Sequence, residues 1–123
     1  MRTAQTTRNA DAALAACAEV CRNAAAASEA CEAACLRSGR LDSLRRCLEL
    51  SGDCADLCRS AARIAARPRA GVRHLKAVLR VCAALCEEYA VLCGRHDDVP
   101  ACIVSKLACA QCVAACKRAL SLL

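Results

Sequence analysis

Cysteine is the residue type best able to do chemistry in this chain, which carries 14 cysteines in 123 residues. Many of them stand four residues apart. Residues at this spacing lie one turn apart on the same face of an α-helix, so a pair can present two sulfurs to one ion. The parallel side chains disfavour a disulfide within a pair. The five pairs are Cys17/Cys21, Cys31/Cys35, Cys54/Cys58, Cys82/Cys86 and Cys112/Cys116.

Soft metal ions are the natural ligands of such thiols. Cu(I) accepts two or three thiolates and fits the paired spacing best. Zinc sites usually use Cys-x-x-Cys knuckles on turns, a spacing that only Cys109 and Cys112 have here. Iron–sulfur clusters need defined sets of four cysteines. The sequence favours several Cu(I) ions; zinc or another soft metal, an iron–sulfur cluster, and an interaction module that uses cysteine as a small core residue remain as alternatives.

The cysteines are expected to be reduced. The first eight residues lack the apolar segment of a signal peptide, so we expect a cytoplasmic protein. Small disulfide scaffolds are rich in turns, whereas this chain has only four Gly and two Pro. A high density of thiols in a reducing compartment indicates metal ligands.

The elements that must position the sulfurs are helices. Ala, Leu and Cys dominate the apolar residues, and the only aromatic residue is Tyr89. Ser38-Gly39, Pro68 with Gly71, and Gly94 mark the turns. We predict an all-α fold of one domain over 1–123, with helices at about 9–37, 42–67, 72–93 and 99–120. Asp42 or Ser43 should cap the second helix, and Val99-Pro100 should open the fourth.

Short turns make neighbouring helices antiparallel, which predicts an up-down four-helix bundle with a cysteine-lined core. Positions spaced alternately by four and three residues face the axis of such a bundle. All the cysteines fall on these positions: Cys17, Cys21, Cys31, Cys35, Cys47, Cys54, Cys58, Cys82, Cys86, Cys93, Cys102, Cys109, Cys112 and Cys116.

The two ends of this column should differ. Aliphatic residues gather at one end and form a plug: Leu14, Ala61, Ala65, Leu75, Leu79, Ala119 and Leu123. The opposite end keeps its thiols and is expected to be open: Cys31, Cys35, Cys47, Cys93 and Cys102. We call this end the mouth.

Some axial positions carry no sulfur, namely Ser28, Ser51, Tyr89 and Ser105. They leave the continuity of the column open. If each copper takes two unshared thiolates the chain holds about 7 ions, and if every thiolate bridges two coppers it holds about 14. Gly52 lies inside the second helix, where it marks either a close-packing site or a local break.

His96 lies in the loop at the mouth, beside Asp97 and Asp98, and is a candidate ligand for incoming copper. His74 belongs to the plugged end and is expected on the surface. No acid pair, nucleophile motif or phosphate loop is visible, so the chain is not expected to be an enzyme.

The charge and hydropathy of the chain limit the classes of partner that it is expected to have. The formal net charge is +6, from 18 basic and 12 acidic residues. There is no basic run and no nucleic-acid-binding motif, so no nucleic-acid partner is expected. No apolar run approaches the roughly 20 residues of a membrane span, so no membrane partner is expected.

A four-helix bundle lined with Cys-x-x-x-Cys pairs over about residues 9–122 resembles the bacterial copper storage proteins. Met1 is the only methionine of the chain, and in this respect the chain is similar to the cytosolic branch of that family. The resemblance implies a core filled with many Cu(I) ions, a homotetramer, and histidines near the entrance. A copper chaperone would be the expected donor or acceptor.

Overall fold

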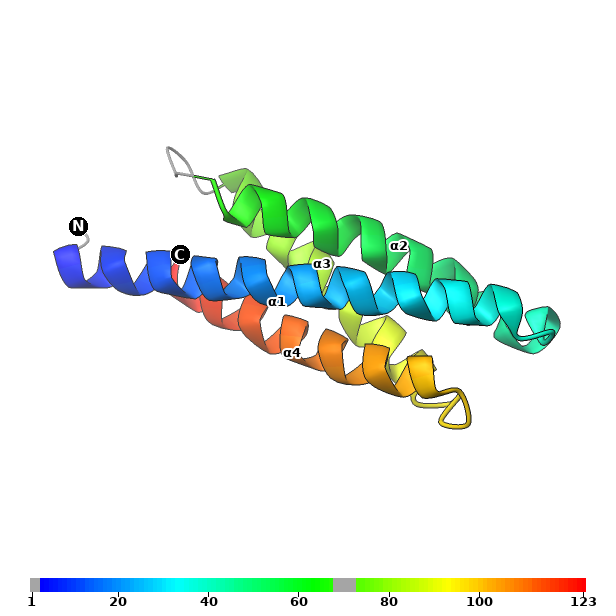
Figure 1. The fold of residues 1–123 in the computed structure, drawn as a ribbon. Helices are drawn as coiled ribbons and strands as arrows, with labels where there is room; N and C mark the ends of the chain where they lie inside the picture. The colour runs from blue at the N-terminus through cyan, green and yellow to red at the C-terminus, as the bar shows by residue number, and fades with distance from the viewer. Residues whose placement is uncertain (1–2, 68–72) are drawn as a thin grey trace.

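The protein is an all-α bundle of four helices. The computed structural model describes residues 3–67 and 73–123, and these contain no β-strand. Pro68, Gly71 and the predicted helix start at residue 72 lie outside the described residues. The helices are α1 (Ala4–Arg37), α2 (Leu41–Ala65), α3 (Arg73–Cys93) and α4 (Pro100–Leu122) (Figure 1).

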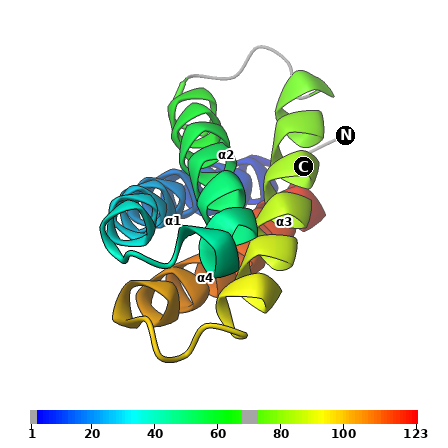
Figure 2. The ribbon, with the colours of Figure 1, turned by 90° about the vertical axis from the view of Figure 1, so that its right-hand side faces the viewer.

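The helices surround one core. α1 packs against α2 and α4, and α3 packs against the same two helices. Viewed from the end that carries the α1–α2 and α3–α4 turns, the four helices enclose a common axis (Figure 2). The predicted up-down bundle is confirmed. α1 is the longest helix, and its first turns extend beyond the other three (Figure 1).

α1 begins at Ala4 rather than at about residue 9. The Thr3 side chain accepts a hydrogen bond from the Thr6 backbone N–H at 3.1 Å. One turn later, the Gln5 amide donates to the Asn9 side chain at 2.9 Å. The cap satisfies one of the N–H groups that a helix start leaves without a partner, so the polar residues that were expected to be irregular continue the helix.

The start of α2 also differs from the prediction. The residue before its first turn is Arg40, which makes no capping bond with its side chain. Ser43 instead donates its hydroxyl to the Arg40 carbonyl at 3.1 Å. The predicted cap at Asp42 or Ser43 was therefore wrong. The predicted start of α4 is confirmed, with Pro100 in its first turn, and Gly39 follows α1 with a φ of +73° that glycine adopts freely.

Gly52 is a close-packing site. α2 runs through it without a break. A Cβ atom at this position would lie 2.6 Å from Oε2 of Glu32 on α1. The glycine therefore makes room for the Glu32 carboxylate.

The plug at one end of the bundle is confirmed. Leu14, Leu75, Leu79 and Ala119 are buried, and Leu123 is half-buried. Small and branched aliphatic side chains pack between the helices there, beside a cavity of about 640 Å³ that Leu14, Ala65 and Leu123 help to line.

Helix α4 is, by length and composition alone, apolar enough to cross a membrane. In the bundle its cysteines are buried against the neighbouring helices. On its outer side, Lys117 forms an ion pair with Glu87 of α3 at 2.8 Å. The core helix of a bundle passes the same test of length and composition, so the observation is weak evidence for a membrane span.

Candidate metal centre

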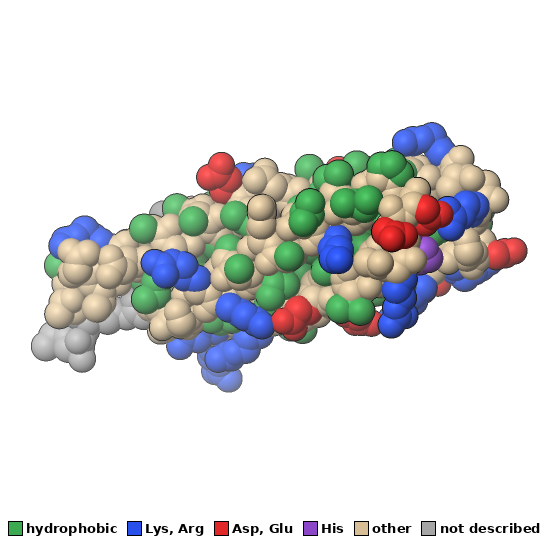
Figure 3. All heavy atoms as spheres, turned by 90° about the horizontal axis from the view of Figure 1, so that it is seen from below, with side chains coloured by type: hydrophobic (Ala, Val, Ile, Leu, Met, Phe, Trp, Pro, Cys, Tyr) green, Lys and Arg blue, Asp and Glu red, His purple; other side chains and the backbone are tan. Residues whose placement is uncertain are grey.

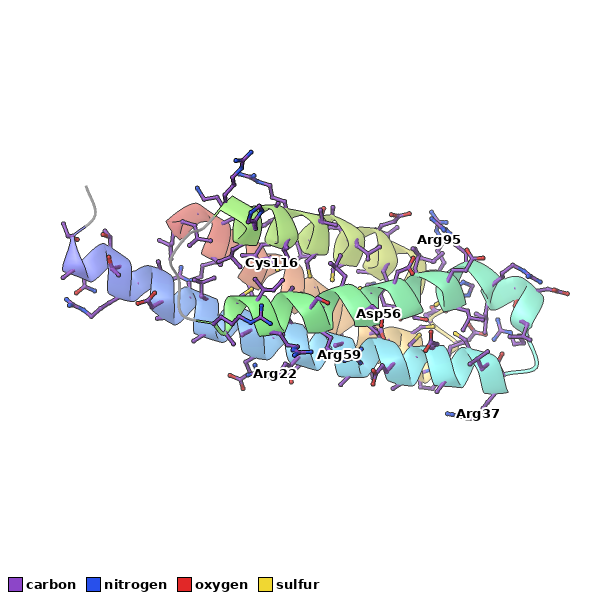
Figure 4. All side chains as sticks on the ribbon, turned by 90° about the horizontal axis from the view of Figure 1, so that it is seen from above. Arg22, Arg37, Asp56, Arg59, Arg95 and Cys116 are labelled. Carbon is purple, nitrogen blue, oxygen red and sulfur yellow. The ribbon has the colours of Figure 1, made fainter. Side chains whose placement is uncertain are left out.

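The candidate site is the interior of the bundle, where all cysteines are free thiols. Each is at most 1% exposed. The sulfurs lie in the interior between the helices, and Cys116 points inward while Arg22, Arg37, Arg59 and Arg95 lie at the outside (Figure 4). The helical spacing therefore does what the sequence predicted, because it directs every thiol to the common axis.

The thiols nearest the mouth form one group, which we call the mouth compartment. The Cys31 sulfur lies 3.9 Å from that of Cys47 and 3.6 Å from that of Cys102. The Cys47 and Cys102 sulfurs are 3.7 Å apart. Cys93 completes a set of four whose sulfurs all lie within 4.8 Å of one another, one from each helix. Cys35, one turn above Cys31, belongs to the same end.

The remaining nine thiols form the deep compartment. They make a connected chain of sulfur contacts between 3.4 and 4.0 Å, of which Cys54–Cys86 and Cys58–Cys86 are the shortest at 3.4 Å. Cys82 and Cys112 each belong to two of the sets of four sulfurs in this region. The members of the deep compartment are Cys17, Cys21, Cys54, Cys58, Cys82, Cys86, Cys109, Cys112 and Cys116.

A layer of hydroxyl groups separates the two compartments. It consists of four axial positions that carry a hydroxyl group in place of a sulfur, one from each helix, and all four are fully buried: Ser28, Ser51, Tyr89 and Ser105. No sulfur–sulfur contact found among the described residues crosses this layer. The column is therefore discontinuous, a point that the sequence left open.

Two of the three serines in the hydroxyl layer bond to the backbone. Ser105 donates to the Ala27 carbonyl at 2.9 Å, and Ser51 donates to the Leu48 carbonyl at 2.8 Å. Ser28 lies 4.0 Å from the Cys109 sulfur of the deep compartment. The Tyr89 hydroxyl is buried with no hydrogen-bond partner. As expected, Tyr89 fills the core, but its hydroxyl is an unsatisfied polar group there.

The mouth is closed, contrary to the expectation that this end is open. The Cys35 carbonyl accepts a bond from the Ser38 hydroxyl at 2.7 Å, as the chain turns over this end. Arg40 in that turn pairs with Asp98 in the α3–α4 turn at 2.7 Å. The bond from Arg40 lowers the pKa of the Asp98 carboxyl. The two turns meet at this end, and the mouth thiols are at most 1% exposed.

Hydrogen bonds between thiols set the acidities in the mouth compartment. Interactions with the thiols of Cys47 and Cys93 lower the pKa of Cys31. The pKa of Cys47 rises in turn, because its proton is held by Cys31. Burial raises the pKa of Cys102 to about 12, and the neighbouring charge of Cys31 adds to the effect. The first thiolate of the mouth is therefore expected at Cys31.

The same pattern recurs in the deep compartment. The pKa of Cys112 is lowered mainly by a bond from Cys116, and the pKa of Cys116 is raised by the same bond. Bonds from Cys116 and Cys21 lower the pKa of Cys17 to about 4. In each compartment, neighbouring thiols thus lower the pKa of some cysteines, and a lowered pKa favours the deprotonated sulfur that a metal ion needs as its ligand.

The two histidines lie far apart in the fold. His96 is half-buried in the α3–α4 turn, and its backbone N–H donates to the Cys93 carbonyl at 3.0 Å. Among the described residues, no set of potential metal ligands includes His96. His74 is exposed near the start of α3, as expected. The structure therefore brings the cysteines together but leaves the imidazole of His96 outside the sulfur sets.

Comparison with known proteins identifies the family. The model of the copper storage protein family (Csp) matches residues 9–121. The chain belongs to the copper storage protein family. Two solved structures from Streptomyces lividans have the same fold. One, of a cytosolic copper storage protein loaded with five coppers, is 33% identical with a TM-score of 0.87, over 91% of this chain and 95% of that chain.

The second structure is a variant of the Streptomyces lividans protein in which two histidines are replaced by alanine. It is 34% identical to this chain, has a TM-score of 0.86, and covers 90% of this chain and 95% of that chain. A curated relative is the uncharacterized cysteine-rich protein YhjQ of Bacillus subtilis, which is 29% identical over 98 residues, 78% of this chain and 88% of the relative. Copper binding in this chain thus follows from its family, and the sulfur compartments described above are the groups available for it.

Proposed function

We propose that this protein stores multiple Cu(I) ions in the cytosol by binding them to its core thiols, and that the whole chain acts as one domain. The observation that carries the proposal is the burial of all the cysteines along one axis, with sulfurs 3.4–4.0 Å apart. Buried thiolates that contact one another can share soft monovalent ions and keep them from water. The cytosolic relative from Streptomyces lividans supports the location.

Storage predicts a high metal-to-protein ratio. Anaerobic titration of the reduced protein with Cu(I), monitored with a chromogenic Cu(I) chelator, should saturate at about 7 to 14 equivalents per chain. Loading replaces thiol protons, so it should also acidify a weakly buffered sample. Saturation at one or two equivalents would contradict storage and would favour a chaperone or sensor.

The interaction-module alternative makes the opposite prediction. If the cysteines only fill the core, the wild type should bind no soft metal tightly. An iron–sulfur protein would be coloured as purified, and elemental analysis would distinguish iron or zinc from copper. The buried thiols also support a store rather than an enzyme, because a thiol catalyst needs a reactive sulfur that its substrate can reach.

His96 is proposed to be a ligand for copper at the entrance. It lies in the turn that covers the mouth compartment, and its backbone is bonded to that of Cys93. Two histidines were replaced by alanine in a variant of the Streptomyces lividans relative, and this supports a test of the histidine in this chain. His96→Ala should slow copper uptake while the final capacity stays nearly unchanged. His74→Ala, at the other end of α3, is the matched control, and equal uptake by both variants would remove His96 from the pathway.

A homotetramer is proposed from the resemblance and from the surface of α4. Ile103, Val104 and Leu107 are 42%, 58% and 60% exposed on the side of α4 opposite its cysteines. The lower side of the molecule, which α4 occupies, shows apolar side chains between scattered charges (Figure 3). Exposed apolar groups of this kind favour association. Light scattering should give four chains, and Leu107→Lys should lower the mass; a monomeric wild type would contradict the proposal.

A copper chaperone is the proposed donor or acceptor. Copper passed between proteins moves by exchange of thiolate ligands, so a partner with an exposed Cu(I)–thiolate site would deliver to the mouth. Copper transfer from such a chaperone should be faster than from the same amount of a small-molecule Cu(I) complex. Equal rates would argue against a docked transfer.

A further inference from the structure

The four sulfurs of the mouth compartment that come from different helices have the dimensions of a tetrahedral site. We call them the mouth tetrad: Cys31, Cys47, Cys93 and Cys102. Three of the sulfur–sulfur distances are 3.6, 3.7 and 3.9 Å. A tetrahedron of sulfurs around Zn²⁺, with Zn–S bonds of about 2.3 Å, has edges of about 3.8 Å. These three distances join Cys31, Cys47 and Cys102 and match one face of such a tetrahedron, and the Cys93 sulfur lies within 4.8 Å of all three.

The tetrad differs from the sulfur sets of the deep compartment. The two deep sets of four share Cys82 and Cys112, so an ion bound in one set takes ligands from the other. The mouth tetrad shares no sulfur with another set, because the hydroxyl layer lies between the compartments. Among the described residues it is the one set of four that shares no sulfur with another set, and Cys35 is the single further thiol beside it.

The electrostatic surroundings also suit an anionic tetrathiolate. Cys102 lies in the first turn of α4, directly after Val99, Pro100 and Ala101. The N-terminus of a helix carries a partial positive charge that stabilises an anion nearby.

We propose that the mouth tetrad is a site for a single divalent soft metal ion, Zn²⁺, distinct in stoichiometry from the copper store. Binding replaces four thiol protons by one Zn²⁺ and leaves a tetrathiolate with a charge of −2, so no oxidation or reduction is involved. The site occupies most of the thiols that lie on the mouth side of the hydroxyl layer. Bound zinc therefore stands between incoming copper and the deep compartment and must be displaced before that compartment fills.

Co²⁺ is a suitable probe, because a tetrahedral tetrathiolate gives it intense visible and charge-transfer bands. The first equivalent added to the reduced, metal-free full chain should give this spectrum, and one equivalent of Zn²⁺ should abolish it. Cys93→Ser should reduce the charge-transfer intensity by about one quarter and weaken Co²⁺ binding at least about tenfold. Cys116→Ser, which removes a thiol from a deep set, is the control and should leave both unchanged.

The assignment would be overturned if Cys116→Ser, but not Cys93→Ser, failed to bind the first equivalent of Co²⁺. An octahedral Co²⁺ spectrum in the wild type would also overturn it. If Cys93→Ser fails to fold by circular dichroism, the wild type still tests the proposal. Protein carrying one Zn²⁺ should release it during the first about two to four equivalents of Cu(I), the number that four thiols hold. Release only after the deep compartment has filled would overturn the site.

The copper capacity of every sample separates this proposal from the proposed function, although the order of zinc release assumes that copper enters at the mouth. Normal copper capacity without a tetrahedral Co²⁺ site would refute the zinc site and leave storage intact. A tetrahedral site in a protein that binds only one or two Cu(I) ions would refute storage and leave the zinc site intact.

Discussion

The mouth and deep compartments are made of the same residue type but differ in connectivity. In the mouth, four helices contribute one sulfur each to a single set, and Cys35 stands beside it. In the deep compartment every helix contributes at least two thiols, and Cys82 and Cys112 are shared between sets. Shared thiols favour a variable number of bridged ions, whereas the isolated set favours a defined one. The spacing of cysteines along each helix and the offset of the helices along the axis together determine how many thiols can share an ion.

The largest expected effect comes from removing equal numbers of thiols from the two compartments. Two variants, each with four Cys→Ala changes, should lose the same share of copper capacity, roughly 30%. Alanine keeps the helices intact because it is the best helix former. Only the mouth variant should load copper onto its remaining thiols more slowly than the wild type, by roughly tenfold or more, because copper then lacks ligands at the entrance. The mouth variant changes Cys31, Cys47, Cys93 and Cys102, and the deep variant changes Cys54, Cys58, Cys82 and Cys86.

Stopped-flow mixing with a Cu(I) complex measures these rates, and a chelator measures the capacities. Circular dichroism and unfolding by urea check that both variants fold. Equal loading rates would show that the compartments fill independently of one another and that copper does not enter through the mouth.

Acidification should weaken copper binding in both compartments. The folded protein holds the Cys102 proton more tightly than an ordinary thiol does, because burial raises its pKa to about 12. Copper must displace this proton, so the apparent affinity falls as the pH is lowered, roughly tenfold per pH unit for each proton released. Competition with a Cu(I) chelator at two pH values measures the slope. An affinity that does not change with pH would mean that copper binds without displacing protons.

The hydroxyl layer between the compartments offers a smaller test. The Tyr89 hydroxyl is buried without a partner, and such a group costs about 1–3 kcal/mol. Tyr89→Phe should therefore raise the free energy of unfolding of the metal-free protein by about 1 kcal/mol, measured by urea denaturation. Ser105→Ala is the contrasting variant: it removes a satisfied bond to Ala27 and should destabilise the protein. A destabilised Tyr89→Phe would indicate that the hydroxyl has a partner, such as an ordered water.

The smallest expected effect is at Gly52, next to the hydroxyl layer. Alanine is favoured over glycine inside a helix by about 1 kcal/mol. The added Cβ would meet only the end of the flexible Glu32 side chain, which can move aside. Gly52→Ala should therefore leave the free energy of unfolding unchanged or raise it by less than about 1 kcal/mol. A clear loss of stability would show that the Glu32 carboxylate is fixed in place against α2.

The sequence was sufficient to predict the fold and the direction of every thiol. A cysteine at a core spacing of three or four residues must face the bundle axis once the helix forms, so periodicity alone places Cys17 and Cys116 inside. The positions of Ser28, Ser51, Tyr89 and Ser105 were likewise visible as gaps. That they lie at the same height and separate two compartments depends on how far each helix is shifted along the axis.

Contacts between helices could not be predicted from spacing. The sulfurs of Cys21 and Cys112 lie 3.5 Å apart although 91 residues separate them, and only the packing of α1 against α4 decides this. The start of α1 was missed because it depends on a single hydrogen bond from the Thr6 N–H to the Thr3 side chain. The start of α2 was missed because the residue before it, Arg40, makes no side-chain capping bond. The closed mouth was missed because it depends on an ion pair between two turns, Arg40 with Asp98, that no local pattern encodes.

The position of Tyr89 has a practical consequence. The chain contains no Trp and no Phe, so this one phenol is the only aromatic side chain. It is buried in the layer between the two sets of thiols. Its fluorescence should therefore respond to charge and metal on either side of it and to little else. The protein contains its own optical reporter, and the arrival of metal beside the hydroxyl layer can be followed without attaching a label.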